Sequence, residues 1–185
     1  LLLPLNIQPT KLTQFNLAEL PSGAPPPLGP AADEGAYATV AAAIAAAERV
    51  VVKVGGGARA CGAELADFLE LADAVAVTSP LVSGVIPYDH PRNMTVGGSK
   101  GSLCGNYAME LADFLVVVGS RSVCQADSSR TGYPLVERVV NINADPEDAM
   151  HYNKTMALVG DASRSLGKIN KTMRAGRQQV IVGSS

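Results

Sequence analysis

The chain has 185 residues, of which 47% are hydrophobic and 17% are charged, and its formal net charge is -2. This composition predicts one folded domain and argues against a disordered chain. The sequence has no cluster of basic residues that would indicate a nucleic-acid-binding surface. Its apolar runs, such as Phe114 to Val118, are too short to span a membrane. The three cysteines, Cys61, Cys104 and Cys124, form no C-x-x-C pair, so neither a disulfide framework nor a zinc site is indicated and a cytoplasmic setting is expected.

Two segments precede the predicted domain. Residues 1–8 contain an apolar run, Leu1 to Ile7, that predicts a short strand without a partner of its own. Residues 9–34 contain six prolines, and proline fixes φ and lacks an N–H, so this stretch is predicted to be a semi-extended linker outside the core. Because the first residue is not Met, we expect the chain to be a fragment.

Helices and strands alternate over residues 35–174. In chain order, the patterns predict a helix at 37–48, a strand at 49–54, a helix at 59–71, a strand at 74–78, a loop at 79–100, a helix at 102–111, strands at 114–118, within 136–143 and at 156–159, a helix at 162–173, and a connector tail at 175–185. The strands are continuous apolar runs, as in sheets that are buried on both faces. The expected fold class is therefore α/β, with a doubly wound open parallel sheet of five to six strands that is Rossmann-like.

A glycine turn follows the first strand of the domain. Gly55, Gly57 and Ala60 fit the G-x-G-x-x-G/A spacing, in which free N–H groups at a helix start attract a phosphate. The second strand ends at Thr78 without the acidic residue of an ordinary dinucleotide site, so nicotinamide binding is not favoured. An equally good alternative to a phosphate site is that Gly55, Gly56 and Gly57 serve only to turn the chain from the strand into the helix.

Few residues suggest catalysis. Lys53 lies in an apolar strand and could reach a phosphate, but a lysine with its head in solvent is the preferred interpretation. His90 and His151 are the only histidines, and the sequence has no metal-ligand spacing and no G-x-S-x-G turn. Cys61 is expected in the core, and a reactive role remains open for the other two cysteines, which lie near predicted strand ends.

Two further polar segments lie at predicted loop positions. The glycine loop from Gly98 to Ser102 contains Lys100 and resembles a phosphate loop, but it lacks the full G-x-x-x-x-G-K-[ST] pattern, so magnesium-nucleotide hydrolysis is not favoured. Asn143 follows the fourth strand, where a polar group could contact a ribose or adenine. Asp145 before Pro146 is better explained as a helix N-cap.

Taken in order, these pieces resemble the central domain of the acetolactate synthase and pyruvate oxidase family of thiamine-diphosphate enzymes. The matching segments are Gly55-Gly56-Gly57, Thr78, Gly84-Val85-Ile86-Pro87, Asp89-His90-Pro91, Gly98 to Gly101, Ala112-Asp113, Val118-Gly119-Ser120-Arg121, Asn141 to Pro146 and Val159-Gly160-Asp161-Ala162. They cover roughly residues 35–170, and residues 3–8 look like the end of the pyrimidine-binding domain that precedes this domain in the family.

The resemblance implies a three-domain parent enzyme and a homo-oligomer, in which the other domains bind thiamine diphosphate and magnesium and carry out catalysis. Gly160-Asp161 continues with Ala162 and does not match the family's magnesium motif, so this chain is expected to hold no metal and no catalytic residue. Its partners would be the other domains of the same enzyme. The parent is expected to act on 2-oxo acids as a transferase or lyase.

The middle domain of the family binds FAD, ADP or nothing. The resemblance implies a ligand site at Gly55, Gly56, Gly57, Thr78, Gly98, Lys100, Gly101, Gly119, Arg121 and Asn143. The family's flavin-binding Gly-Met-His-Gly is Gly98 to Gly101 here, without the Met and His, so a scaffold or a smaller nucleotide is preferred to FAD. The alternatives are a free-standing nucleotide- or flavin-binding module, a domain of a cyclic-dione hydrolase similar to the trihydroxycyclohexanedione hydrolases, and an NAD-consuming deacylase, which would need a zinc module.

Overall fold

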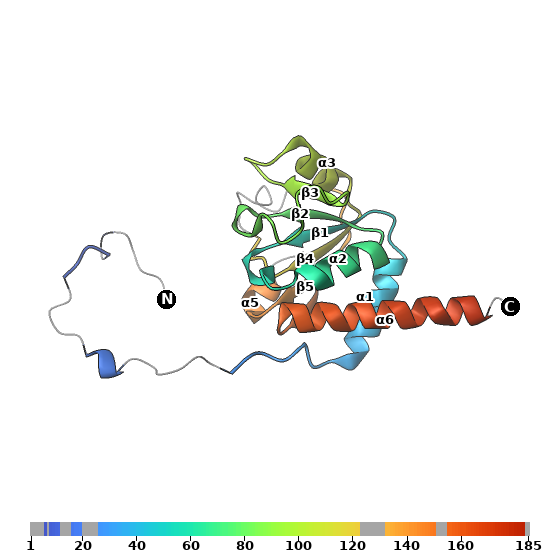
Figure 1. Ribbon diagram of the computed structural model, residues 1–185, viewed down its shortest axis with the longest axis horizontal. Helices are drawn as coiled ribbons and strands as arrows, with labels where there is room; N and C mark the ends of the chain where they lie inside the picture. Colours follow the sequence, from blue (N-terminus) through green and yellow to red (C-terminus); the bar gives the residue numbers. More distant parts are fainter. Residues whose placement is uncertain are drawn as a thin grey trace.

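The computed structural model of the chain describes residues 6, 8–11, 16–19, 26–122, 132–150 and 155–183. In these residues six strands form one sheet in the order β3-β2-β1-β4-β5-β6, and every neighbouring pair is parallel. The predicted open parallel α/β sheet is confirmed, and Figure 1 shows helices on both of its faces. Apart from Asn6, the strand predicted at residues 1–7 lies outside the described residues.

The elements follow the predicted alternation of strands and helices. The strands are β1 Val50–Val54, β2 Val75–Thr78, β3 Asn93–Val96, β4 Phe114–Val118, β5 Arg138–Asn143 and β6 Thr155–Val159. The α-helices are α1 Glu34–Ala45, α2 Gly62–Leu71, α3 Leu103–Leu111, α5 Pro146–Ala149 and α6 Ala162–Gly183, and the 3-10 helices are η1 Leu17–Glu19, η2 Gly56–Ala58 and η3 Pro80–Val82. None of these helices has the length and apolar character that a membrane span requires.

Two clusters of buried side chains hold the sheet between its helices. The larger cluster joins alternate residues of the strands to α1, α2 and α6, and its members include Val52, Phe68 and Leu166. The smaller cluster lies on the opposite face and includes Val51, Val117 and Met109 of α3. Since β1 and β4 are the two central strands and are buried on both faces, they read as uninterrupted apolar runs in the sequence.

The edge strand β3 was predicted as part of a loop, and this prediction is wrong. Its sequence, Asn-Met-Thr-Val, alternates polar and apolar residues, and all four are only half-buried. The register between β2 and β3 shifts between Ala76 and Thr78, and Thr95 has a φ of +64°. A short, irregular edge strand with polar residues therefore lacks the apolar run by which the other strands were recognised.

Several helix ends also differ from the prediction, and α1 both begins and ends three residues earlier than predicted. Helix α1 begins at Glu34 because the Asp33 carboxylate accepts hydrogen bonds from the N–H groups of Gly35 and Ala36. Helix α2 begins at Gly62 rather than at residue 59, because the 3-10 turn η2 comes first. Helix α6 continues ten residues beyond the predicted end at Met173, since the single Gly176 costs only about 1 kcal/mol in a helix that other residues favour.

Candidate functional site

The carboxyl edge of the sheet contains the point where the strand order reverses. From β1 the chain continues to β2 on one side, while β4 lies on the other side and is followed by β5. Ligands of open parallel α/β sheets bind at the carboxyl ends of the strands at such a point. The predicted site residues all lie at this edge: Gly55, Gly56 and Gly57 after β1, Thr78 at the end of β2, Gly98, Lys100 and Gly101 after β3, Gly119 and Arg121 after β4, and Asn143 at the end of β5.

The turn after β1 contacts the loop after β4 through main-chain atoms. The Gly55 N–H donates to the Val118 carbonyl at 2.9 Å, and the Gly57 N–H donates to the Gly119 carbonyl at 2.9 Å. A Cβ on Gly55 would lie 2.5 Å from the Gly119 oxygen, and a Cβ on Gly119 would lie 2.6 Å from the Gly57 Cα. These glycines therefore allow two main chains to approach each other across the crevice, and two of their N–H groups serve that contact.

No helix starts directly after this turn. Residues 56–58 form the 3-10 turn η2, and α2 follows only at Gly62. A Cβ on Gly62 would lie 3.0 Å from the Val85 oxygen, so the loop that follows η3 packs against the start of α2. The strand–turn–helix geometry that presents a helix N-terminus to a pyrophosphate is therefore not formed at the β1 turn.

The second glycine loop, residues 97–102, also uses its N–H groups internally. The Gly98 N–H donates to Oδ1 of Asn106 at 2.8 Å, and the Gly101 N–H donates to the Gly98 carbonyl at 2.9 Å. The Ser102 N–H donates to the Val96 carbonyl at 2.7 Å, and the Ser102 hydroxyl accepts from the Gly105 N–H at 2.9 Å. The N-cap predicted for Ser102 is confirmed, while the Lys100 side chain is exposed to solvent.

Asn143 and the β4 loop form a third part of this edge. The Asn143 amide donates to the Ser120 carbonyl at 3.0 Å, and its Oδ1 accepts from the Asp145 N–H at 3.2 Å. Asp145 in turn caps α5 by accepting from the Glu147 N–H at 2.9 Å, which confirms the N-cap prediction. Both ends of the Asn143 side chain are therefore engaged with the protein, and Arg121, which follows Ser120 in the chain, is exposed.

Lys53 of β1 is fully buried, and the prediction of a solvent-exposed head is wrong. Its register neighbours are Val77 of β2 and Val117 of β4, both of which are also fully buried. A residue of a central strand has no open sheet edge, so this lysine cannot extend sideways into water as an edge lysine does. The sequence of β1 did not reveal this, because only the strand order shows which strand is central.

Cys61 lies in the core directly after the β1 turn, as predicted, with 1% of its surface exposed. Burial, followed by the negative charges of Glu64 and Asp161, raises the pKa of the Cys61 thiol from 9.0 to about 11. The thiol therefore stays protonated at neutral pH and is a poor nucleophile. Cys104, in the first turn of α3, is exposed, and Cys124 lies outside the described residues.

Two buried serines at this edge were not recognised in the sequence. Ser120 follows Gly119 and is buried. A Cβ added to Gly55 would lie 2.5 Å from the Ser120 Cβ, so the β1 turn packs directly against Ser120. Ser79 follows Thr78, and in the described part of the chain its buried hydroxyl has no hydrogen-bond partner. Ser120 lies in the segment Val118–Arg121 that carries the family resemblance, whereas the only sequence signal for Ser79 was its position at the end of an apolar strand.

Metal chemistry has no support in the described residues, in which no three His, Cys, Asp or Glu side chains gather in a way that would hold an ion. Nδ1 of His90 accepts from the Arg92 N–H at 3.2 Å, which is a turn-stabilising role. His151 lies outside the described residues.

The fold and the order of its loops agree with what is known of related proteins. The family model for the thiamine pyrophosphate enzyme central domain matches residues 37–169. The chain is 32% identical over 102 residues to a probable acetolactate synthase 2, chloroplastic, of rice, and these cover 55% of the chain and 15% of the relative. It is 28% identical over 133 residues to a probable acetolactate synthase large subunit of Methanococcus aeolicus (70% and 22% covered). It is 27% identical over 131 residues to the acetolactate synthase isozyme 1 large subunit of Escherichia coli (71% and 23% covered).

The fold defines an α/β domain of the doubly wound type, and the family match is more specific. The chain belongs to the thiamine pyrophosphate enzyme central domain family. It spans between 15% and 23% of the length of the three relatives described above.

Proposed function

We propose that this chain is the central domain of a thiamine-diphosphate-dependent enzyme that resembles acetolactate synthase and acts on 2-oxo acids as a transferase or lyase. The observation that carries the proposal is the family match over residues 37–169, which begins in α1 and ends in α6 and so includes the whole described sheet. In such a parent, thiamine diphosphate with magnesium would supply the electron sink for carbon–carbon chemistry. The described residues would contribute packing and positioning, and the chain alone would be inactive.

Within the parent, we propose that the domain is a scaffold that binds no FAD. Support comes from the two glycine loops, in which Gly55, Gly57, Gly98 and Gly101 donate their N–H groups to other atoms of the protein. A dinucleotide pyrophosphate needs such donors to be free. A smaller nucleotide such as ADP would have to rely on the exposed cations of the edge, Lys100 and Arg121, which is a weaker arrangement.

Titration calorimetry of the 185-residue chain with FAD, ADP and NAD tests the scaffold proposal. We expect no FAD binding in the micromolar range, and FAD binding at micromolar affinity or better contradicts the proposal. If ADP binds, Lys100→Ala should weaken it about tenfold, since one charge-assisted hydrogen bond is worth roughly 1.5–3 kcal/mol. Lys171→Ala is the matched control, because Lys171 is an exposed lysine on α6, away from the loops of the carboxyl edge.

The parent activity is tested with the complete reading frame that encodes this chain. Its purified product, given thiamine diphosphate and magnesium, should convert pyruvate or another 2-oxo acid, while the 185-residue chain should show no turnover under the same conditions. Turnover by the short chain alone contradicts the proposal. Hydrolysis of a cyclic dione by the complete protein would assign it to the cyclic-dione hydrolases of the same family.

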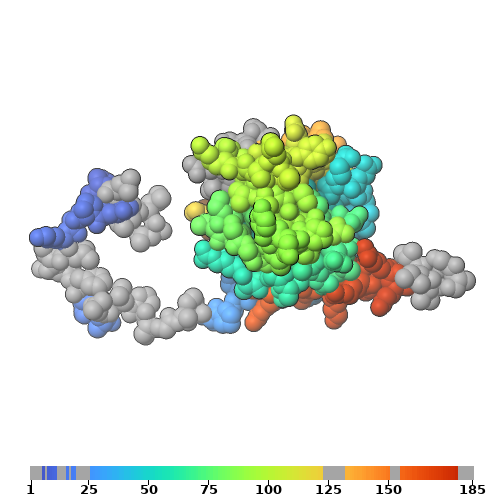
Figure 2. Space-filling view, turned by 45° about the horizontal axis from the view of Figure 1, so that its top comes forward, coloured from blue at the N-terminus to red at the C-terminus, as the bar shows by residue number. Residues whose placement is uncertain are grey.

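The partners proposed for this domain are the other domains of the enzyme and a further subunit. The outer face of α3 supports this, because Leu103 and Tyr107, one helical turn apart, are 90% and 65% exposed. Figure 2 shows the yellow-green surface around α3 at the top of the domain. Large apolar side chains that gather on one exposed helix face are typical of interaction surfaces.

A further inference from the structure

The last residues of the proline-rich segment are attached to the domain by main-chain hydrogen bonds. The Gly29 carbonyl accepts from the Asp161 N–H at 2.7 Å, and the Ala31 N–H donates to the buried Ser165 hydroxyl at 3.1 Å. Ala31 is only 4% exposed and belongs to the larger core cluster. The N-terminal end of α6 is therefore occupied by residues 29–31, although the sequence suggested that this stretch lies outside the core.

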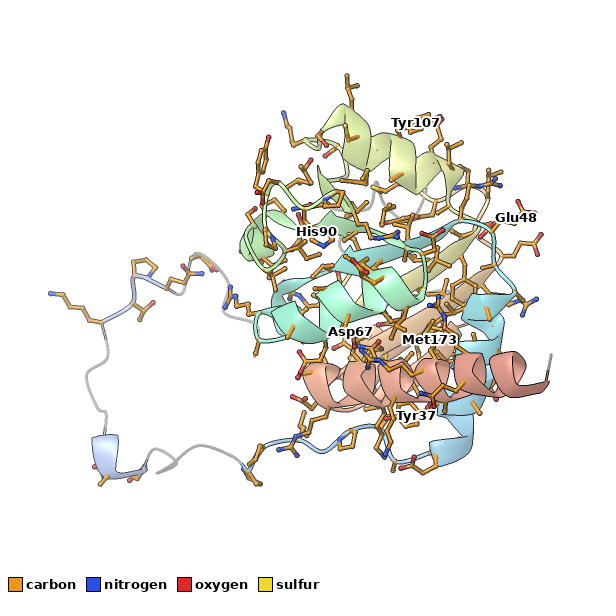
Figure 3. All side chains as sticks on the ribbon, turned by 45° about the vertical axis from the view of Figure 1, so that its right-hand side comes forward. Tyr37, Glu48, Asp67, His90, Tyr107 and Met173 are labelled. Atoms are coloured by element: carbon orange, nitrogen blue, oxygen red, sulfur yellow. The ribbon has the colours of Figure 1, made fainter. Side chains whose placement is uncertain are left out.

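Tyr37 of α1 completes the attachment. Its hydroxyl donates to the Ala31 carbonyl at 2.8 Å, and its ring is buried with the Lys168 ammonium 5.3 Å from the ring centroid. Lys168 also pairs with Glu34 at the start of α1. Figure 3 shows Tyr37 lying beside α6, close to the incoming segment. Both polar groups of Ala31, its N–H and its carbonyl, are therefore satisfied by side chains of the domain.

Gly160 makes room for the segment. A Cβ on Gly160 would lie 2.6 Å from the Ala31 nitrogen and 2.8 Å from both the Gly29 oxygen and the Pro30 carbonyl carbon. These are main-chain atoms, which cannot turn away as the end of a side chain can. By contrast, a Cβ on Gly167, which lies within α6, would have no neighbouring atom within 4 Å. Because Gly160 has no side chain, the main chain of residues 29–31 can lie directly against the surface that Gly160, Asp161 and Ser165 form.

We infer that residues 29–31 are an anchor that fixes the point where the preceding chain enters the domain. Any domain attached through the proline-rich segment then pivots at Gly29 and not at the start of α1. The inference rests on the proposed function only for what lies upstream of residue 9.

Hydrogen–deuterium exchange of the complete 185-residue chain, read by mass spectrometry, tests the anchor. We expect peptides that contain Ala31 and Asp161 to be protected in the wild type. Gly160→Ala should raise their exchange rate at least tenfold and leave β1 and β4 protected, while the matched control Gly167→Ala should leave the Ala31 peptide unchanged. Wild-type exchange of the Ala31 peptide at the rate of a free peptide overturns the inference, as does unchanged protection in Gly160→Ala.

Two milder variants keep the test valid if Gly160→Ala does not fold. Tyr37→Phe removes the donor to the Ala31 carbonyl, and Ser165→Ala removes the acceptor of its N–H, with little change in volume. Each should raise the exchange of the Ala31 peptide several-fold, and the double variant should raise it further. No increase in either variant overturns the inference. The outcome does not depend on nucleotide binding or on 2-oxo acid turnover, so failure of the proposed function would be seen separately.

Discussion

The two glycine loops of the carboxyl edge look alike in the sequence and differ in what they contact. The turn after β1 packs against the loop after β4, which lies more than sixty residues later in the chain. In the loop after β3, a Cβ on Gly101 would meet the Val96 oxygen at 2.6 Å, an atom only five residues away. Glycine spacing therefore predicts a close approach of main chains, and only the neighbouring strands decide whether that approach serves a ligand or the fold.

The cysteines that follow the two loops show the same difference. Cys61 is buried in the larger core cluster, while Cys104 is exposed in the first turn of α3. Within the loops themselves burial is mixed: Gly55 is buried and Gly57 exposed after β1, while Gly98 is buried and Lys100 exposed after β3. A substitution at the buried Gly55 should therefore cost more stability than one at the capping Ser102 or the exposed Lys100.

The largest effect is expected for Gly55→Ala. Its Cβ would lie 2.5 Å from the Gly119 oxygen, so the two central strands would have to separate at their carboxyl ends. We expect a loss of about 3 kcal/mol in the free energy of unfolding, measured by urea denaturation, which is the upper part of the range for overpacking. Gly56→Ala is the control, because its nearest atom, Cδ1 of Leu81, is 3.9 Å away. Equal stability of the two variants would show that the β1 turn is not packed as described.

The next effect is a pH dependence at Cys61, the buried residue that precedes α2. The folded state raises the pKa of Cys61 to about 11, so the unfolded state releases this proton first as the pH rises above 9.0. The contribution of the neutral thiol is present below pH 9 and is lost progressively between pH 9 and 11, by about 2 kcal/mol in total. The measurement is the stability difference between the wild type and Cys61→Ala from pH 8 to 10.5. A difference that stays constant over this range contradicts the buried position.

A smaller effect is expected for Ser102→Ala in the loop after β3. The Ser102 hydroxyl caps α3 and is 2.6 Å from the Thr95 hydroxyl, so its loss should lower the free energy of unfolding by about 1 kcal/mol. Ser102→Thr retains the hydroxyl and should recover most of the loss in the same urea experiment. A loss as large as that of Gly55→Ala would remove the distinction between the two loops.

The smallest effect is expected for Lys100→Ala, which changes an exposed side chain of the loop after β3. Thermal denaturation should show a change of no more than about 0.5 kcal/mol, as for other surface substitutions. This variant therefore reports on ligand binding without a change in folding. A marked loss of stability would mean that Lys100 has a structural role that its exposure does not suggest.

The sequence predicted the parts of this domain whose patterns are local. The runs of β1, β4 and β5, the capped helix starts at Ser102 and Asp145, and the burial of Cys61 all depend on residues within a few positions of one another. The half-buried edge strand β3 gave too weak a pattern, and the length of α6 was underestimated because residues 175–185 were predicted to be a connector tail. The glycines of the candidate site were found, but their contacts were not.

By itself, the sequence determined the alternation of strands and helices and the positions of the glycines, because secondary structure and turns follow from periodicity and from the φ that each residue allows. The tertiary structure alone decided that β1 and β4 are neighbours, that Lys53 is buried between Val77 and Val117, and that residues 29–31 lie over Gly160. Each of these contacts joins atoms that are at least twenty residues apart in the chain. Side-chain burial and main-chain approach at such separations depend on which elements pack together, and no local pattern records that choice.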